Sequence, residues 1–289
     1  MPLALLILGN RREADRLGSL LHSWGLRPVW VAEPELAIEQ AGRESADLMI
    51  FDARLAPDGA YGDPWAPIRC GRGLAGTALI PLGEHRQARR GLKVGPSFPI
   101  AMPWDESKVR DAITLARAWR DKLQNDRRVA EATIEFQSTT HHLFEATELL
   151  LNLIGSTSLP EDQTRQFRQA FLEMGQNAIE WGNRLDPSKR VRVEYRQFVD
   201  RLEVSIRDEG PGFNPRSLPH AACAEDPITH LDVRQNLGLR DGGFGLLIVR
   251  GMVDDLRYNE AGNEVLLVRH FPPPAHPHAL RLTQKVAGS

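Results

Sequence analysis

The first hundred residues alternate short apolar runs with amphipathic stretches, and this alternation limits the folds that the chain can adopt. Apolar runs occupy residues 3–8, 28–32, 47–52, 77–82 and 98–102, and the stretches 13–24 and 34–41 read as helices. Short apolar strands that alternate with helices predict a parallel sheet covered on both faces. We therefore expect a doubly wound α/β domain of five strand–helix units.

A long amphipathic stretch follows at residues 105–129, with its apolar side chains on one stripe and many Arg, Lys and Asp elsewhere. It predicts one helix that closes the first domain and continues as a charged connector. The apolar stripe either packs on the sheet of its own domain or serves as a dimerising connector, and the sequence leaves both interpretations open.

The second half changes character, because its strands alternate with period two and occur in blocks. We expect strands at residues 133–137, 191–195, 202–206 and 265–269, and helices at 142–154, 161–181 and 243–253. Blocks of helices and antiparallel hairpins predict an α+β sandwich. The domains are accordingly placed at 1–122 and 133–271, with a helical connector at 123–132 and a disordered tail at 272–289.

Charge and cysteine content exclude several classes of protein. Lys plus Arg number 36 and Asp plus Glu number 38, which leaves no basic surplus for direct nucleic-acid binding. The two cysteines have no metal-ligand spacing, so neither a disulfide framework nor a thiolate metal site is expected. The apolar run at 3–8 is too short for a membrane span or a signal-peptide core. These observations predict a cytoplasmic protein without membrane contact.

Three short motifs in the second half carry the strongest chemical signal. They comprise Glu173 and Asn177; Asp208, Gly210 and Gly212; and Gly243, Gly245 and Leu246. The first pair lies four residues apart on one helix face, the second motif follows a strand, and the third begins a helix. A carboxylate at a strand end can accept a hydrogen bond from an exocyclic amine, and glycines let the backbone approach a ligand. Each motif alone is weak, but the three in this order predict a nucleotide site.

Residues 133–271 resemble the ATP-binding domain shared by gyrase, the Hsp90 chaperone, histidine kinases and MutL, known as the Bergerat (GHKL) fold. The resemblance rests on EMGQNAIEWGN (173–183), RDEGPGFNP (207–215) and GGFGLLIVRGMVDDL (242–256). Within that superfamily the sequence is most similar to the serine-kinase anti-sigma factors of the general-stress and sporulation type.

The resemblance implies a role for each matching residue. Asn177 corresponds to the family's magnesium ligand, and Glu173 corresponds to its general base. Asp208 corresponds to the carboxylate that reads adenine, with Gly210 and Gly212 as its supporting glycines.

The third motif and the segment before it correspond to the family's phosphate-binding parts. Gly243 and Gly245 match the phosphate-loop glycines. Residues 214–241 match the ATP lid, where Arg234 and Arg240 are candidates for contact with the γ-phosphate. One departure is Trp181, which stands where the family has a histidine, and the adjoining Asn183 is one conceivable replacement.

The order of elements separates this chain from histidine kinases. A sensor kinase carries a two-helix phosphoacceptor module before its ATP-binding domain, whereas here the connector runs directly into a strand. His141 and His142 begin the helix after that strand, where capping roles are more common than phosphoacceptor roles. The sequence therefore favours the Ser/Thr kinase type.

Residues 1–122 resemble the receiver domain of response regulators, with Asp52 at the phosphoacceptor position and ADLMIFDARLAPDG (46–59) around it. The rest of the receiver pocket is replaced. Gly9 and Asn10 occupy the acidic pair that would hold magnesium, Gly83 replaces the hydroxyl residue, and Met102 replaces the lysine. Asp52 is thus a weak phosphoacceptor candidate, and we expect a degenerate receiver that acts as a binding or dimerising surface.

The resemblances together imply an ATP- and Mg²⁺-dependent serine/threonine protein kinase of the anti-sigma-factor type. Its expected substrate is a STAS-domain anti-anti-sigma factor in a partner-switching pathway, with a sigma factor as a further partner and a homodimer as the expected assembly. The alternative is a non-catalytic module whose protein binding is gated by ATP. A free-standing ATPase of the gyrase type is disfavoured, because no transducer domain is expected after residue 271.

Overall fold

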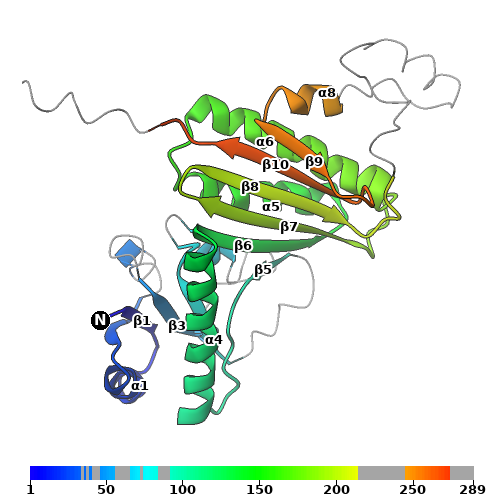
Figure 1. The fold of residues 1–289 in the computed structure, drawn as a ribbon. Helices are drawn as coiled ribbons and strands as arrows, with labels where there is room; N and C mark the ends of the chain where they lie inside the picture. Colours follow the sequence, from blue (N-terminus) through cyan, green and yellow to red (C-terminus); the bar gives the residue numbers. More distant parts are fainter. Residues whose placement is uncertain are drawn as a thin grey trace, which may run out of the picture.

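The computed structural model describes residues 1–33, 36, 39–40, 46–55, 66–71, 74–83, 92–213 and 245–273. These residues form two sheets. A four-stranded parallel sheet has the order β2-β1-β3-β4, and a six-stranded sheet has the order β5-β6-β7-β8-β10-β9 (Figure 1). None of the described helices is long and apolar enough to cross a membrane.

The parallel sheet confirms the doubly wound α/β prediction. Its strands are β1 (Leu3–Ile7), β2 (Arg27–Val31), β3 (Leu48–Asp52) and β4 (Ala78–Leu82). Helix α1 (Arg11–Ser23) begins where the Asn10 carboxamide accepts hydrogen bonds from two backbone amides, and it buries Leu17 and Leu21 against the sheet. The fifth strand expected at 98–102 is reduced to one bridge, between Leu82 and Ile100. Most of the helix expected at 34–41 lies outside the described residues.

The helix expected at 105–129 is α4 (Glu106–Asn125), which packs its apolar stripe into the core of the parallel sheet. The connector expected to be helical at 123–132 is helical only to Asn125. Arg127 has the positive φ of 56° that often ends a helix, and strand β6 (Arg128–Gln137) begins directly after it. The prediction was wrong because the charged residues at the end of the helix continue into the first residues of β6, so the period-two pattern of the strand is recognisable only further along.

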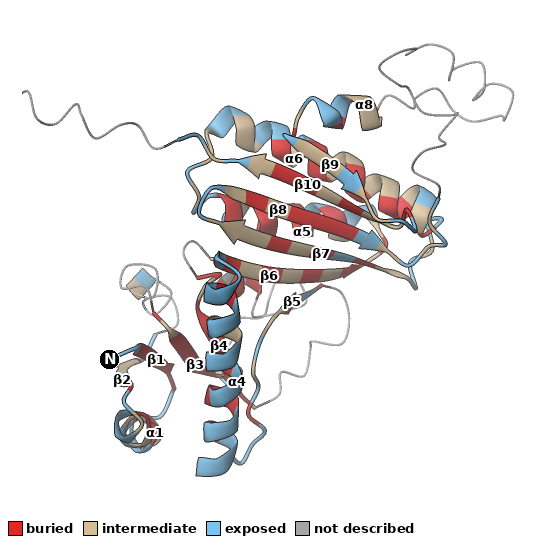
Figure 2. Ribbon diagram, in the orientation of Figure 1, coloured by how far each residue is buried: buried red, intermediate tan, exposed pale blue. Residues whose placement is uncertain are grey.

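The larger sheet confirms the predicted α+β sandwich. Its other antiparallel strands are β7 (Arg190–Phe198), β8 (Arg201–Asp208), β9 (Asp255–Tyr258) and β10 (Glu264–His270). Helices α5 (Thr140–Ile154), α6 (Glu161–Asn177) and α8 (Gly245–Arg250) complete this half, with α5 and α6 along one face of the sheet (Figure 1). Buried residues alternate with less buried ones along β6 and β7 (Figure 2), which is the pattern of a sheet with one covered face.

One strand of the larger sheet comes from the first half of the chain. β5 (Lys93–Gly95) pairs antiparallel with Thr133–Glu135 of β6, and no local pattern predicted it. Apolar residues around it join the core of the second half rather than that of the parallel sheet. These are Ala66, Cys70, Ala75, Leu92 and Val94. The core of the larger sheet is therefore built from both halves of the chain, whereas the parallel sheet has cores of its own.

A fully buried arginine lies where the two halves meet. Arg69, at the end of the short helix α3 (Ala66–Arg69), donates hydrogen bonds to the carbonyl oxygens of Thr77, at 2.8 Å, and Pro96. Its guanidinium lies 5.4 Å from the ring centroid of Trp119 on α4. Burial lowers the pKa of Arg69 to about 10, so the side chain remains charged at neutral pH. This cation links α3, the approach to β4, the segment after β5, and α4.

Candidate functional site

Glu173 and Asn177 lie in the last turns of α6, on the side of the helix next to its buried stripe. The stripe consists of Phe167, Ala170, Phe171 and Met174, and it fixes the rotation of the helix on the sheet. Both polar side chains are partly buried, and neither has a hydrogen-bond partner among the residues that the structure describes. Within the described part of the chain, no polar contact of the carboxylate or the carboxamide competes with a ligand.

The helix that carries this pair does not continue as an α-helix to Trp181, as the sequence predicted. Residues Ala178–Gly182 form a π-helical turn, in which the Asn183 amide donates to the Ala178 carbonyl oxygen at 2.8 Å. Trp181 on this turn is 48% exposed. π turns are rare and frequent at functional sites, and this one delivers Gly182 to the end of β8.

Asp208 ends β8 and lies against that π turn. Its Oδ1 accepts a hydrogen bond from the Gly210 amide at 2.7 Å, and a methyl group added at Gly182 would overlap its carboxylate. A methyl group at Gly210 would overlap the Gly182 carbonyl. Burial raises the pKa of Asp208 above its ordinary value, although the hydrogen bond from Gly210 acts in the opposite direction. Glycine is thus required at 182 and 210 for the loop and the helix end to meet.

The third glycine of this motif shapes the far side of the loop. Gly212 has a φ of +73°, and a methyl group there would overlap the Ala261 carbonyl in the turn between β9 and β10. Phe213 then packs edge-on against Tyr258, with ring centroids 5.0 Å apart, and the Tyr258 hydroxyl lies 3.6 Å from the Met174 sulfur. Burial raises the pKa of Tyr258 to about 12. These side chains form an apolar layer between β9 and α6.

Gly245 begins α8 directly against Glu173, because a methyl group at Gly245 would overlap the Glu173 carboxylate. Leu246 is partly buried and packs on the core of the second half. The structure thus brings the first and third motifs together. Gly243 lies outside the described residues, as do the expected lid and its candidates Arg234 and Arg240.

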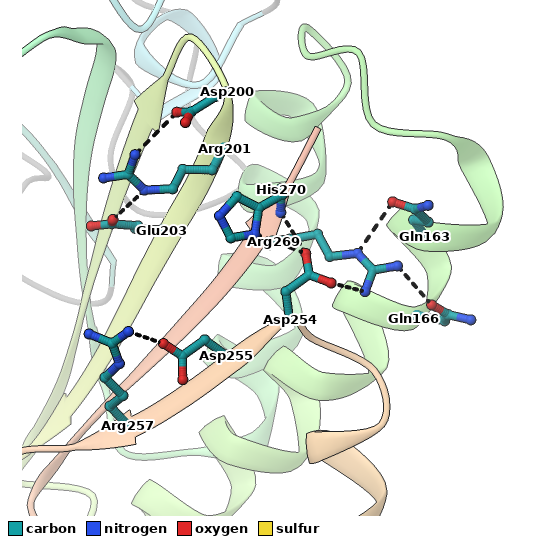
Figure 3. A network of polar contacts seen from close by, with 10 residues as sticks. All are labelled: Gln163, Gln166, Asp200, Arg201, Glu203, Asp254, Asp255, Arg257, Arg269 and His270. Atoms are coloured by element: carbon teal, nitrogen blue, oxygen red, sulfur yellow. Dashed lines mark hydrogen bonds and ion pairs between the residues drawn. The ribbon is translucent and has the colours of Figure 1, made fainter. Parts of the chain in front are cut away.

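A polar network holds the turn that follows α8 (Figure 3). Arg269 on β10 donates hydrogen bonds to Gln163 at 3.3 Å and Gln166 at 3.4 Å, both at the start of α6, and to Asp254 at 3.2 Å. Asp254, just before β9, also accepts from the His270 amide at 2.7 Å. This network was not predicted, since its members are far apart in the sequence. It fixes the exit of α8 relative to the helix that carries Glu173.

Asp52 in the first half is engaged by a neighbouring cation. Its carboxylate accepts hydrogen bonds from the Arg54 amide at 2.9 Å and from the guanidinium at 2.6–3.1 Å. Burial alone would raise the pKa of Asp52, but these hydrogen bonds and the positive charge of Arg54 lower it overall. Asn10 caps α1, and Gly83 has a φ of +89° that disfavours other residues. The described surroundings of Asp52 contain no group of three or more metal-ligating residues.

Comparisons with known proteins agree with the sequence motifs. Residues 136–269 match the family model described as the histidine kinase-like ATPase domain. The serine-protein kinase RsbW of Bacillus subtilis is 26% identical over 111 residues, which cover 38% of this chain and 66% of that protein. RsbW of Bacillus licheniformis is 26% identical over 96 residues, covering 33% and 57%. The chain thus spans less than two thirds of the length of these relatives.

Several solved structures are similar to the first half of the chain. One is a response regulator receiver modulated diguanylate cyclase from Pelobacter carbinolicus, with 17% identity and a TM-score of 0.34, covering 43% of this chain and 99% of that chain. Another is the receiver domain of a sensor histidine kinase from Pseudomonas aeruginosa, with 21% identity and a TM-score of 0.33, covering 42% and 98%. The doubly wound fold of this half rests on its strand order. In the second half, the matched family, the sheet and the motifs agree: residues 136–269 form a histidine kinase-like ATPase domain.

Proposed function

We propose that the chain binds Mg-ATP between the end of α6, the end of β8 and the start of α8, and transfers the γ-phosphoryl group to a serine or threonine. The observation that carries this proposal is the meeting of the three motifs. Glu173 lies against Gly245, and Asp208 of β8 lies against Gly182, so both candidates are located at the end of α6 and the π turn that follows it.

The residues present suit a magnesium ion that arrives with the nucleotide. The Asn177 carboxamide oxygen is a hard ligand without a described partner, and Mg²⁺ at nucleotide sites takes most of its ligands from phosphates and water. No group of three or more His, Cys, Asp or Glu is gathered among the described residues to hold a metal alone. When bound, Mg²⁺ would neutralise charge on the phosphates.

The chain's own residues would then divide the work of phosphoryl transfer. Asp208 accepts a hydrogen bond from the exocyclic amine of adenine and fixes the orientation of the nucleotide. Glu173 accepts the proton of the attacking serine or threonine hydroxyl. The hydroxyl oxygen bonds to the γ-phosphorus while the bond between that phosphorus and the ADP oxygen breaks. Gly245 and Gly243 leave the backbone free to approach the phosphates.

The partners remain part of this proposal. Similarity to proteins named serine-protein kinase supports Ser/Thr specificity. The substrate proposed from the resemblance of the motifs is a STAS-domain anti-anti-sigma factor, with a sigma factor as a further partner. A homodimer and a cytoplasmic location belong to the same hypothesis. The second candidate function is a non-catalytic module gated by ATP, and the observation that favours it is the exposed Trp181 at the histidine position.

Calorimetry with Mg-ATP tests the nucleotide site first, using the wild type, Asp208→Asn and Asn177→Ala. We expect binding by the wild type and much weaker binding by both variants. Absence of binding by the wild type would refute the proposal.

Glu173→Gln separates the two candidate functions, because the general base contributes about 10²–10⁴-fold to rate. We expect phosphate transfer to a STAS-domain protein to fall at least about a hundredfold, with Mg-ATP affinity unchanged. Glu161→Gln, on the exposed first turn of the same helix, is the matched control. If Glu173→Gln transfers phosphate like the wild type, the carboxylate is not the base. If neither form transfers phosphate but the wild type still binds the protein partner in an ATP-dependent manner, the gated module is favoured.

A further inference from the structure

Asn183 is the polar residue that the structure buries most completely beside the proposed nucleotide site. Its exposed fraction is 0%, and it lies directly after the π turn of Ala178–Gly182. The π turn fixes its backbone, because the Asn183 amide donates to the Ala178 carbonyl oxygen. Its side chain therefore points inward, away from a ligand, and it does not take the place of the missing histidine.

The carboxamide of Asn183 connects three strands to the end of α6. Nδ2 donates to the Ser138 hydroxyl at 3.2 Å, just after β6, and to the Arg190 carbonyl oxygen at 3.0 Å, at the start of β7. Oδ1 accepts from the Glu209 amide at 2.9 Å, just after β8. Both amide hydrogens and the oxygen are used, which defines the orientation of the carboxamide.

The bond to Glu209 is the one that bears on nucleotide recognition. Glu209 follows Asp208 directly, so this bond fixes the peptide group between them. A second contact holds the same residue, because the Arg190 amide donates to the Glu209 carboxylate at 2.9 Å. On the other side of Asp208, its own amide donates to the Asn263 carbonyl oxygen at 3.0 Å. The backbone is therefore restrained both before and after the Asp208 side chain.

We propose that Asn183 is a positioning residue for base recognition, which holds the Asp208 carboxylate where it accepts a hydrogen bond from the exocyclic amine. This inference rests on the proposed function, because it assigns a role within the same nucleotide site. Asn183 does not touch the nucleotide. It acts through its hydrogen bond from the Glu209 amide, and its bond to Ser138 links it to the end of β6, the strand that pairs with β5.

A residue that only stabilises the fold would give a different result from one that positions Asp208. Loss of fold stability lowers the melting temperature but leaves the relative affinity of two nucleotides unchanged. Displacement of Asp208 lowers the affinity for ATP more than that for ITP, because ITP carries an oxygen in place of the amine. The ratio of the two dissociation constants therefore reports the position of Asp208.

The experiment measures that ratio by calorimetry in the full chain for Asn183→Ala, Ser138→Ala and the wild type. We expect the preference for ATP over ITP to fall about tenfold in Asn183→Ala and about threefold in Ser138→Ala, which loses one acceptor of the carboxamide. Asp208→Asn is the reference for complete loss of the preference. Thr147→Ala is the matched control, since the described hydrogen bond of this buried hydroxyl lies within α5, and its loss leaves the ratio unchanged.

The outcomes separate this inference from the proposed function. Absence of ATP binding by the wild type refutes the proposed function. A wild type that prefers ATP, together with folded variants of unchanged preference, overturns the role of Asn183 alone. If Asn183→Ala does not fold, Ser138→Ala decides, because its small side chain has a single described hydrogen bond.

Discussion

Leu92→Ala tests whether the first half of the chain contributes to the core of the ATPase domain. Leu92 precedes β5, is 1% exposed, and belongs to the apolar core of the larger sheet. Leu→Ala at such a position removes the transfer free energy of the lost carbons and leaves a cavity, which costs about 2–5 kcal/mol. We take about 3 kcal/mol, a substantial share of the 5–15 kcal/mol that stabilises an ordinary domain.

Native-state amide hydrogen exchange, measured peptide by peptide, reports in which strands the free energy of unfolding is lowered. A loss of about 3 kcal/mol raises the exchange rate of protected amides in β7 by roughly a hundredfold, because each 1.4 kcal/mol corresponds to a factor of ten. Leu17→Ala, equally buried in the core of the parallel sheet, is the matched control and acts on the amides of β1. If Leu92→Ala accelerates exchange in β1 but leaves β7 at the wild-type rate, the contribution of the first half to the core of the larger sheet is refuted.

Three further predictions concern Gly245, Asp208 and Asp52. Gly245→Ala places a methyl group on the Glu173 carboxylate, so we expect ATP turnover to fall at least about tenfold. Gly251→Ala is the control, because the nearest atom is 3.4 Å from its new carbon, and its turnover should stay within about twofold of the wild type. Equal turnover of the two variants would contradict the geometry. Burial raises the pKa of Asp208, so the folded state is favoured below the unfolded pKa and loses that advantage as pH rises through the folded pKa. Asp208→Asn should then melt above the wild type at about pH 7.5 and equal to it near about pH 3, and a constant difference would argue against this linkage. Asp52 is already paired with a guanidinium, so acetyl phosphate with Mg²⁺ should add no phosphoryl mass to the intact protein; an added phosphoryl group lost in Asp52→Asn would show a working receiver.

The sequence predicted those parts of the fold whose signal is local. Val191 and Val193 alternate with polar neighbours because one face of their sheet is buried, and period two follows directly from that. β5 was missed because it has three residues and the residues that pair with it, Thr133–Glu135, lie about forty residues later. The π turn was missed because nothing in AIEWG distinguishes it from an α-helix.

The same distinction applies to the candidate site. Glu173, Asn177 and Asp208 could be proposed from the sequence because each belongs to a motif that reads along the chain. The hydrogen bonds of Asn183 could not be predicted, since Ser138 lies 45 residues before it and Glu209 lies 26 residues after it. A buried carboxamide that connects distant strands has no signature in one sequence.

The order of the strands in the larger sheet limits how two copies of the chain can associate. Its borders are the three-residue β5 and the four-residue β9, whereas the ten-residue β6 and the nine-residue β7 lie inside. Short border strands offer few free backbone groups to a neighbouring molecule, which protects a sheet against extension from one molecule to the next. The uncovered face carries ion pairs between its own Arg and Glu side chains, such as Arg192 with Glu135 and Glu194. Any association of two copies through the described sheet would therefore depend on matching side-chain charges and shapes rather than on main-chain pairing.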